Sequence, residues 1–141
     1  HVRSRRQRQM CIRDRFLTGK EAAKYMLPRG RGSIFFTGAT ASVRGGAGFA
    51  AFSGAKFALR SLSQSMAREL GPQGIHVAHF IIDGAIDTPF IQENFPETYA
   101  LKEKNGILQP TEIAEAYWSV HVQHPSAWTQ EMDLRPYMEK F

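Results

Sequence analysis

The sequence predicts an α/β fold in which parallel strands alternate with covering helices. Two nearly all-apolar segments, residues 33–37 and 75–82, have the length and composition of strands that are buried on both faces. Between them, residues 49–70 place apolar side chains at steps of three and four, which is the period of a helix. A strand, a helix and a second strand in this order predict two parallel strands joined by a helical crossover.

Two segments before the central helix complete this unit. Residues 16–27 carry a stripe of small and apolar side chains and are followed by Pro28, so we predict a helix that ends there. Residues 37–48 are rich in glycine but lack the spacing of a phosphate-binding motif. We interpret them as a tight turn at the carboxyl end of a strand, where open α/β sheets bind ligands.

The C-terminal part of the chain predicts an irregular segment, a helix and a last strand. Residues 89–106 mix aromatic and charged side chains without a clear period. Residues 111–122 are predicted to form a helix that begins at Thr111, and residues 128–135 a strand.

The net charge of +5 lies at one end of the chain. Residues 1–15 hold six of the 18 basic residues and one of the 13 acidic ones, which leaves 12 of each in the rest. We therefore expect no nucleic-acid partner. Residues 10–15 resemble a reading frame through a sequencing adapter, so residues 1–15 are predicted to be a non-native or disordered tail and residues 16–141 the folded domain. A genuine basic tail is the alternative.

Composition also argues against metal, disulfide and membrane roles. Cys11 is the only cysteine, so cysteines alone offer neither a disulfide nor a zinc framework. His121 and His124 have helical spacing but no third ligand, and we interpret them as surface histidines. Without a long apolar run or a signal peptide, a soluble cytoplasmic protein with no membrane partner is expected.

The central helix carries the motif that identifies a family. Lys56 follows Phe52 by one helical turn, and Ala39 precedes Phe52 by 13 residues. The segment resembles the C-terminal half of the short-chain dehydrogenase/reductase family, whose members carry Tyr-x-x-x-Lys on this helix and a serine 13 residues before the tyrosine. The resemblance covers residues 16–141 and is close over residues 32–89.

The resemblance implies the C-terminal half of a Rossmann-like, doubly wound parallel sheet, with about three strands, flanking helices and the N-terminal strands missing. It also implies a catalytic Lys56 that binds the ribose of NAD or NADP. Phe52 and Ala39 stand at the tyrosine and serine positions, without the hydroxyl groups that those residues use.

A second match follows the second strand. Residues 83–88 are similar to the family turn Pro-Gly-x-x-x-Thr, with Asp83 in place of the proline. The resemblance implies that Gly84, Ile86 and Thr88 contact the nicotinamide half of the cofactor. It also implies that residues 89–106 form a mobile cover over the substrate. The glycine-rich motif that binds the pyrophosphate is absent from this chain. The end of the family's second strand, where NAD and NADP are distinguished, is absent as well. Asp83 is either a turn residue or a remodelled acid–base group.

Two functions are compatible with these residues. The first is a fragment of an NAD(P)-dependent oxidoreductase that acts on a carbonyl or alcohol of unknown identity. Its proton donor is then a water or one of four side chains: Thr40, Ser42, Ser53 or Asp83. The alternative is a non-catalytic nucleotide-binding or dimerisation protein of the same fold. The resemblance also implies a homo-oligomer, because family members commonly dimerise through their two long helices.

The missing strands have a consequence for folding. Residues 33–37 are predicted to have an unpaired backbone edge and uncovered apolar faces. We therefore predict that the isolated chain is prone to aggregation or partly molten.

Overall fold

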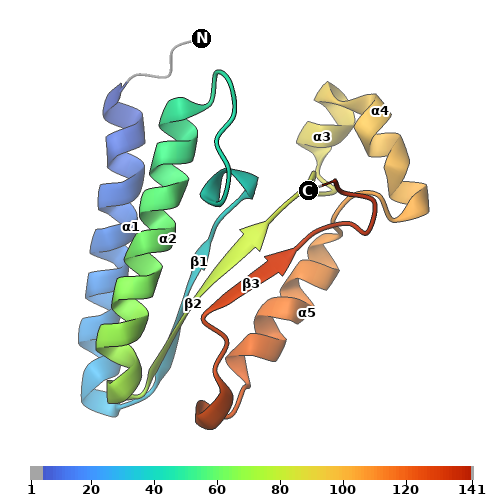
Figure 1. Ribbon diagram of the computed structural model, residues 1–141. Helices are drawn as coiled ribbons and strands as arrows, with labels where there is room; N and C mark the ends of the chain where they lie inside the picture. The colour runs from blue at the N-terminus through green and yellow to red at the C-terminus, as the bar shows by residue number, and fades with distance from the viewer. Residues whose placement is uncertain (1–4, 141) are drawn as a thin grey trace.

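Three parallel strands form one sheet in a computed structural model that describes the backbone of residues 5–140 and the side chains of residues 12–140. In sheet order (Figure 1), the strands are β1 (Gly32–Thr37), β2 (Ile75–Ile82) and β3 (Glu131–Leu134). In the register, Gly32 lies opposite Ile75, and His79 lies opposite Glu131. The predicted fold class, a parallel α/β sheet with flanking helices, is confirmed.

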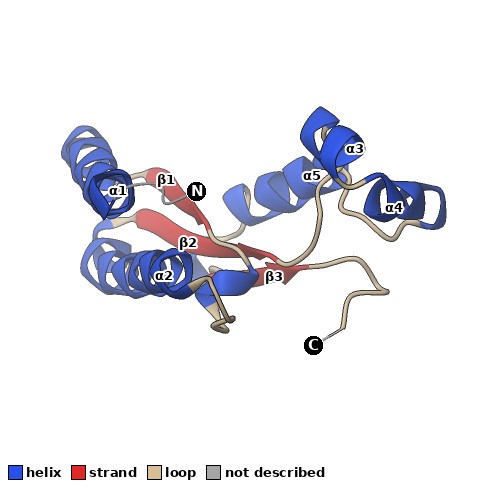
Figure 2. Cartoon of the chain, turned by 90° about the horizontal axis from the view of Figure 1, so that it is seen from above, coloured by secondary structure: helices blue, strands red, loops and turns tan. Residues whose placement is uncertain are grey.

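Helices cover both faces of the sheet (Figure 2). One face is covered by α1 (Arg5–Met26) and α2 (Ala50–Leu70), and the other by α5 (Pro110–His121). Every residue of β2 is buried, because this strand lies in the middle of the sheet with a helix layer on each side.

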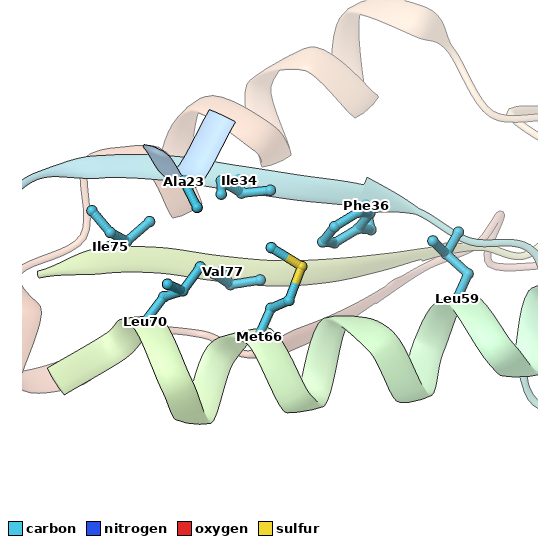
Figure 3. Packing of buried hydrophobic residues seen from close by; sticks show 8 residues of the cluster. All are labelled: Ala23, Ile34, Phe36, Leu59, Met66, Leu70, Ile75 and Val77. Atoms are coloured by element: carbon cyan, nitrogen blue, oxygen red, sulfur yellow. The ribbon is translucent and has the colours of Figure 1, made fainter. Parts of the chain in front are cut away.

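The larger core lies between the sheet and the helix pair α1 and α2. Leu59, Met66 and Leu70 recur at helical steps along α2 and point at the sheet (Figure 3). The buried members of this cluster are Ala23, Ile34, Phe36, Leu59, Met66, Leu70, Ile75 and Val77. This packing fixes the height of α2 against the strand ends, where the candidate site lies.

The apolar faces of β1 are covered, so that part of the prediction for residues 33–37 was wrong. Ile34 and Phe36 are buried under α1 and α2. Phe35 points the other way, and its ring lies 5.3 Å from the Phe80 ring and 6.1 Å from the Tyr117 ring on α5. Side chains alternate across a strand, and helices cover both sides of this one.

One edge of β1 is unpaired within the described residues, because β1 pairs only with β2. An apolar strand with free backbone N–H and C=O groups pairs readily with other chains. We expect the 141-residue chain on its own to form higher oligomers or aggregates when its mass is measured by light scattering across a concentration series. A monodisperse sample with a sharp thermal transition would contradict this.

The predicted ends of three elements differ from the observed ones. The first helix begins at Arg5 and not at residue 16, so residues 5–15 are helical; arginine and glutamine favour helices. Whether residues 1–15 are native to the protein stays a prediction. Helix α5 begins at Pro110 because proline tolerates the first helical position. The last strand covers only Glu131–Leu134 of the predicted 128–135.

Two short helices occupy the segment that was predicted as a cover. They are α3 (Pro89–Asn94) and α4 (Pro96–Tyr99), which follow the carboxyl end of β2. The Lys102 Nζ lies 2.7 Å from the Asp87 Oδ2, an ion pair that ties the far end of this segment back to the turn after β2.

Candidate functional site

The candidate site lies at the carboxyl ends of β1 and β2. The loop after β1 contains a 3₁₀ turn, Thr40–Ser42, and leads into the start of α2. The Gly38 N–H donates to the Phe80 carbonyl at 2.6 Å, which holds the start of this loop against β2. Open α/β sheets bind their ligands at this end, because the loops there are free to carry chemistry while the strands hold them in place.

Phe52 and Lys56 lie side by side on α2, as their spacing predicts. The Lys56 Nζ lies 5.7 Å from the centre of the Phe52 ring. The same amine donates to the Thr37 carbonyl at 3.1 Å. Thr37 is the last residue of β1, so the amine lies at the carboxyl end of the sheet and on the Phe52 side of the helix.

A cavity of about 320 Å³ opens beside this pair. Phe52 and Ala39 both line it, so the structure brings together the two side chains that the sequence motif places 13 residues apart. Its lining comes from the loop after β1, the start of α2 and the end of β2: Ala39, Thr40, Ala41, Arg44, Gly45, Gly46, Phe49, Phe52, Ser53, Ile82 and Gly84. The apolar lining carries few hydroxyl groups.

Asp83 is a buried carboxylate with two partners. Its side chain follows β2 and the residue is 4% exposed. The Thr40 hydroxyl donates to the Asp83 Oδ1, and the Arg135 Nη1 lies 3.5 Å from the Oδ2. The Asp83 N–H donates to the Leu134 carbonyl at 2.8 Å. The side chain therefore does more than shape a turn, since it joins the loop after β1 to the segment after β3.

The three residues predicted to bind the cofactor lie on the turn after β2, but each has different contacts. Gly84 lines the cavity and has a φ of +145°, a conformation in which a side chain is strained. Ile86 forms an isolated bridge with Leu108 and faces a neighbouring hollow. The Thr88 hydroxyl accepts from the Ile91 N–H at 3.3 Å and caps α3.

The two serines near the motif have different surroundings. Ser42 is fully buried, and its Oγ accepts from the Ala39 N–H at 3.1 Å, which closes the 3₁₀ turn. Ser53 is also buried and lines the cavity, but its Oγ has no hydrogen-bond partner among the described residues.

A polar network below the site was not predicted from the sequence. His79 on β2 is fully buried, and its Nδ1 lies 3.0 Å from the Glu131 Oε2 on β3. Arg60 on α2 donates to both oxygens of Glu131, at 2.7 and 2.6 Å. The network ties the helix of the motif to two strands.

These contacts shift the pKa values of the network. Burial lowers the pKa of His79, and the hydrogen bond to Glu131 opposes that shift only in part. Burial alone would raise the pKa of Glu131, but the hydrogen bonds from Arg60 and His79 lower it overall. A neutral His79 that donates its Nδ1–H to an ionised Glu131 satisfies both shifts.

The shifted His79 pKa predicts a pH-dependent stability. A histidine whose folded pKa is lowered binds more protons unfolded, so its contribution is present above about pH 6.5 and is lost as the pH falls toward the folded value. We expect the thermal midpoint of the full-length protein to fall between pH 7.5 and 5.5. His79→Gln should flatten this dependence, whereas His124→Gln, at an exposed position, should keep it. Equal pH slopes in wild type and His79→Gln would contradict the assignment.

The histidines singled out from the sequence have other partners. The His121 Nδ1 lies 2.9 Å from the Ser33 Oγ, and the His124 Nδ1 lies 2.8 Å from the Ser126 Oγ. Across the described part of the chain, no group of three potential ligands is placed to hold a metal ion. None of the helices described here is both long and apolar enough to span a bilayer.

Known proteins resemble this chain in sequence and in structure. Residues 9–98 match the family model described as short chain dehydrogenase. Zerumbone synthase of Zingiber zerumbet is 33% identical over 115 residues, and (+)-borneol dehydrogenase 2 of Salvia officinalis is 36% identical over 86 residues. These alignments cover 72% and 61% of this chain. The crystal structure of a short-chain dehydrogenase from Rhodopseudomonas palustris aligns with a TM-score of 0.72 and 45% identity over 96% of this chain.

The chain spans only part of each of these relatives. The alignments cover 43% of zerumbone synthase, 30% of the borneol dehydrogenase and 55% of the Rhodopseudomonas palustris chain. The family model nevertheless matches more than half of the chain. The matched residues include β1, α2, β2 and the turn after β2, which build the site. The chain therefore belongs to the short chain dehydrogenase family of oxidoreductases.

Proposed function

We propose that the protein containing this chain is an NAD(P)-dependent oxidoreductase that interconverts an alcohol and a carbonyl, and that this chain supplies the nicotinamide side of its site. Family membership supports the reaction class. The observation that carries the proposal is the position of Lys56, whose amine lies at the carboxyl end of β1 beside the cavity that Phe52 lines.

Lys56 is proposed to bind the ribose of the cofactor. Its amine donates to the Thr37 carbonyl at 3.1 Å, and this contact holds the long side chain at the end of β1. A lysine that merely covered the helix surface would need no such fixed partner. A charged donor fixed at a strand end fits the vicinal hydroxyl groups of a ribose.

Phe52 and Ala39 are proposed to occupy the positions of the family tyrosine and serine. Both line the cavity, where a substrate oxygen would lie. A phenyl ring and a methyl group neither donate nor accept a proton. General acid–base help is worth about 10²- to 10⁴-fold in rate, so an active enzyme needs another group for this task.

The turn after β2 is proposed to meet the nicotinamide. Gly84 lets the backbone come close to a planar ring, since it lines the cavity and adds no side chain. The Thr88 hydroxyl is oriented by the Ile91 N–H, which leaves its own proton to donate to a carboxamide. When bound, NAD(P) supplies the hydride acceptor or donor. The residues of this chain hold and orient it.

We further propose that the full-length protein is a homo-oligomer. The two long helices α1 and α2 lie side by side on one face of the sheet (Figure 1). Exposed aromatic side chains, Tyr25 on α1 and Phe57 on α2, add apolar surface to this layer. Sedimentation at several concentrations measures the mass; a monomer at all of them would contradict this assignment.

The test uses the full-length protein that contains this chain. NADH and NADPH binding is measured by fluorescence titration, and hydride transfer by the absorbance of the reduced cofactor over a panel of aldehydes, ketones and alcohols. Binding together with turnover supports the proposal. Binding without turnover on any substrate favours the non-catalytic nucleotide-binding alternative, and absence of binding overturns both. Turnover is expected to survive in Phe52→Tyr.

A further inference from the structure

We propose that Thr40 and Asp83 together form the proton path of this site. The proposal rests on the proposed oxidoreductase function, because a proton path matters only if hydride is transferred. The Thr40 side chain lines the same cavity as Ala39 and Phe52, and Asp83 lies behind it, 4% exposed. The Thr40 hydroxyl donates to the Asp83 Oδ1.

The direction of this hydrogen bond determines what the pair does. Because Thr40 gives its proton to Asp83, the lone pairs of its Oγ remain available to accept a proton from a substrate hydroxyl. A threonine hydroxyl alone is a weak base, and an ionised carboxylate behind it supplies the basicity. Thr40 therefore lies on the cavity side of the pair, and Asp83 lies on the buried side.

Asp83 is held in place from the side away from Thr40. The Arg135 Nη1 lies 3.5 Å from its Oδ2, and the guanidinium also bonds Asp133. The Asp83 N–H is fixed by the Leu134 carbonyl at 2.8 Å. The backbone bond and the cation orient the Oδ1 toward Thr40.

The other hydroxyl groups near the cavity fit the role less well. Ser53 lines the cavity, but no described residue accepts its proton. Ser42 is fully buried behind the 3₁₀ turn and already accepts from the Ala39 N–H. Thr40 is the hydroxyl that combines cavity access with a carboxylate partner.

The proton transfer balances with the hydride transfer. In alcohol oxidation the O–H proton of the substrate passes to the Thr40 Oγ, while the Thr40 proton passes to the Asp83 Oδ1. The C–H bond of the carbinol would break, and a bound NAD(P)⁺ would supply the acceptor for its electron pair and hydrogen as hydride. The carbonyl double bond forms, and protonated Asp83 later returns its proton to water. Carbonyl reduction runs the same path in reverse.

The test compares variants of the full-length protein, with NAD(P)H affinity and kcat measured on each. Thr40→Val and Asp83→Asn are expected to lower kcat by about 10²-fold or more and to leave NAD(P)H affinity within about three-fold. Thr40→Ser keeps the hydroxyl and should retain most of the activity. Thr111→Val, on the exposed first turn of α5, is the matched control and should behave as wild type.

A further readout separates a proton path from a structural role. The double variant Thr40→Val/Asp83→Asn should be no slower than either single variant, because both substitutions interrupt the same path. Wild-type turnover with unchanged kcat in Thr40→Val overturns the pair and leaves the proposed function standing. Cofactor binding without wild-type turnover overturns both.

Discussion

Lys56→Met is expected to weaken NAD(P)H binding to the full-length protein by about 10- to 100-fold, the loss that corresponds to one charged hydrogen bond worth about 1.5–3 kcal/mol. The amine is fixed by the Thr37 carbonyl at 3.1 Å and lies 5.7 Å from the Phe52 ring. Fluorescence titration measures the affinity, and the absorbance of the reduced cofactor measures turnover.

The control for this variant is a lysine outside the site. Lys24 on α1 pairs with Glu21 on the exposed surface of the helix, at 2.7 Å. Lys24→Met makes the same substitution and removes the same charge, and we expect it to leave the affinity for NAD(P)H unchanged. If Lys56→Met bound the cofactor as tightly as Lys24→Met did, Lys56 would be a surface-covering lysine and would have no ribose-binding role.

Gly38→Ala is expected to lower the free energy of unfolding by about 1–3 kcal/mol, the usual cost of forcing extra volume into a packed core. A Cβ at this position would lie 2.6 Å from both the His79 Cε1 and the Ser42 Oγ. Both side chains are fully buried, so neither moves aside without disturbing the network or the 3₁₀ turn. Because the turn carries Ala39 and Thr40, activity should fall together with stability. Chemical denaturation measures the free energy of unfolding, and the absorbance of the reduced cofactor measures the activity.

The same loop provides the matched control for Gly38. Gly45 has open space where a Cβ would be and no strained backbone angle. Gly45→Ala should change the free energy of unfolding by less than about 0.5 kcal/mol. A double-mutant cycle adds a second check, since Gly38→Ala should cost less in a His79→Ala background, where the ring is gone. Equal costs in both backgrounds would contradict steric conflict with His79.

The main elements were predictable because their patterns are local. The apolar segments and the helical period of residues 49–70 gave the two strands and α2 almost to the residue. The adjacency of Phe52 and Lys56 followed from a four-residue step on one helix. The early start of α1 was missed because residues 5–15 were assigned to a tail on the evidence of their charge and unusual sequence.

The hydrogen-bond partners of the polar residues at the site could not be predicted, because they lie far apart in the sequence. Thr40 and Asp83 are 43 residues apart, and Arg60 and Glu131 are 71 apart. The Thr40–Asp83 contact depends on the register of β1 against β2, and the Arg60–Glu131 contact depends on the register of β3 against β2. His79 lies in an apolar strand, and the sequence of that strand does not indicate that its ring contacts the Glu131 carboxylate on β3.

We propose that Lys56 and the cavity beside Phe52 form the nicotinamide end of a cofactor site. A crystal structure of the full-length protein with NAD(P)H is the most direct test. We expect the Lys56 Nζ within hydrogen-bonding distance of a ribose hydroxyl and the nicotinamide ring in the cavity between Phe52 and Gly84. A nicotinamide bound elsewhere, with the Lys56 amine still on the Thr37 carbonyl and in contact with no part of the cofactor, would contradict it.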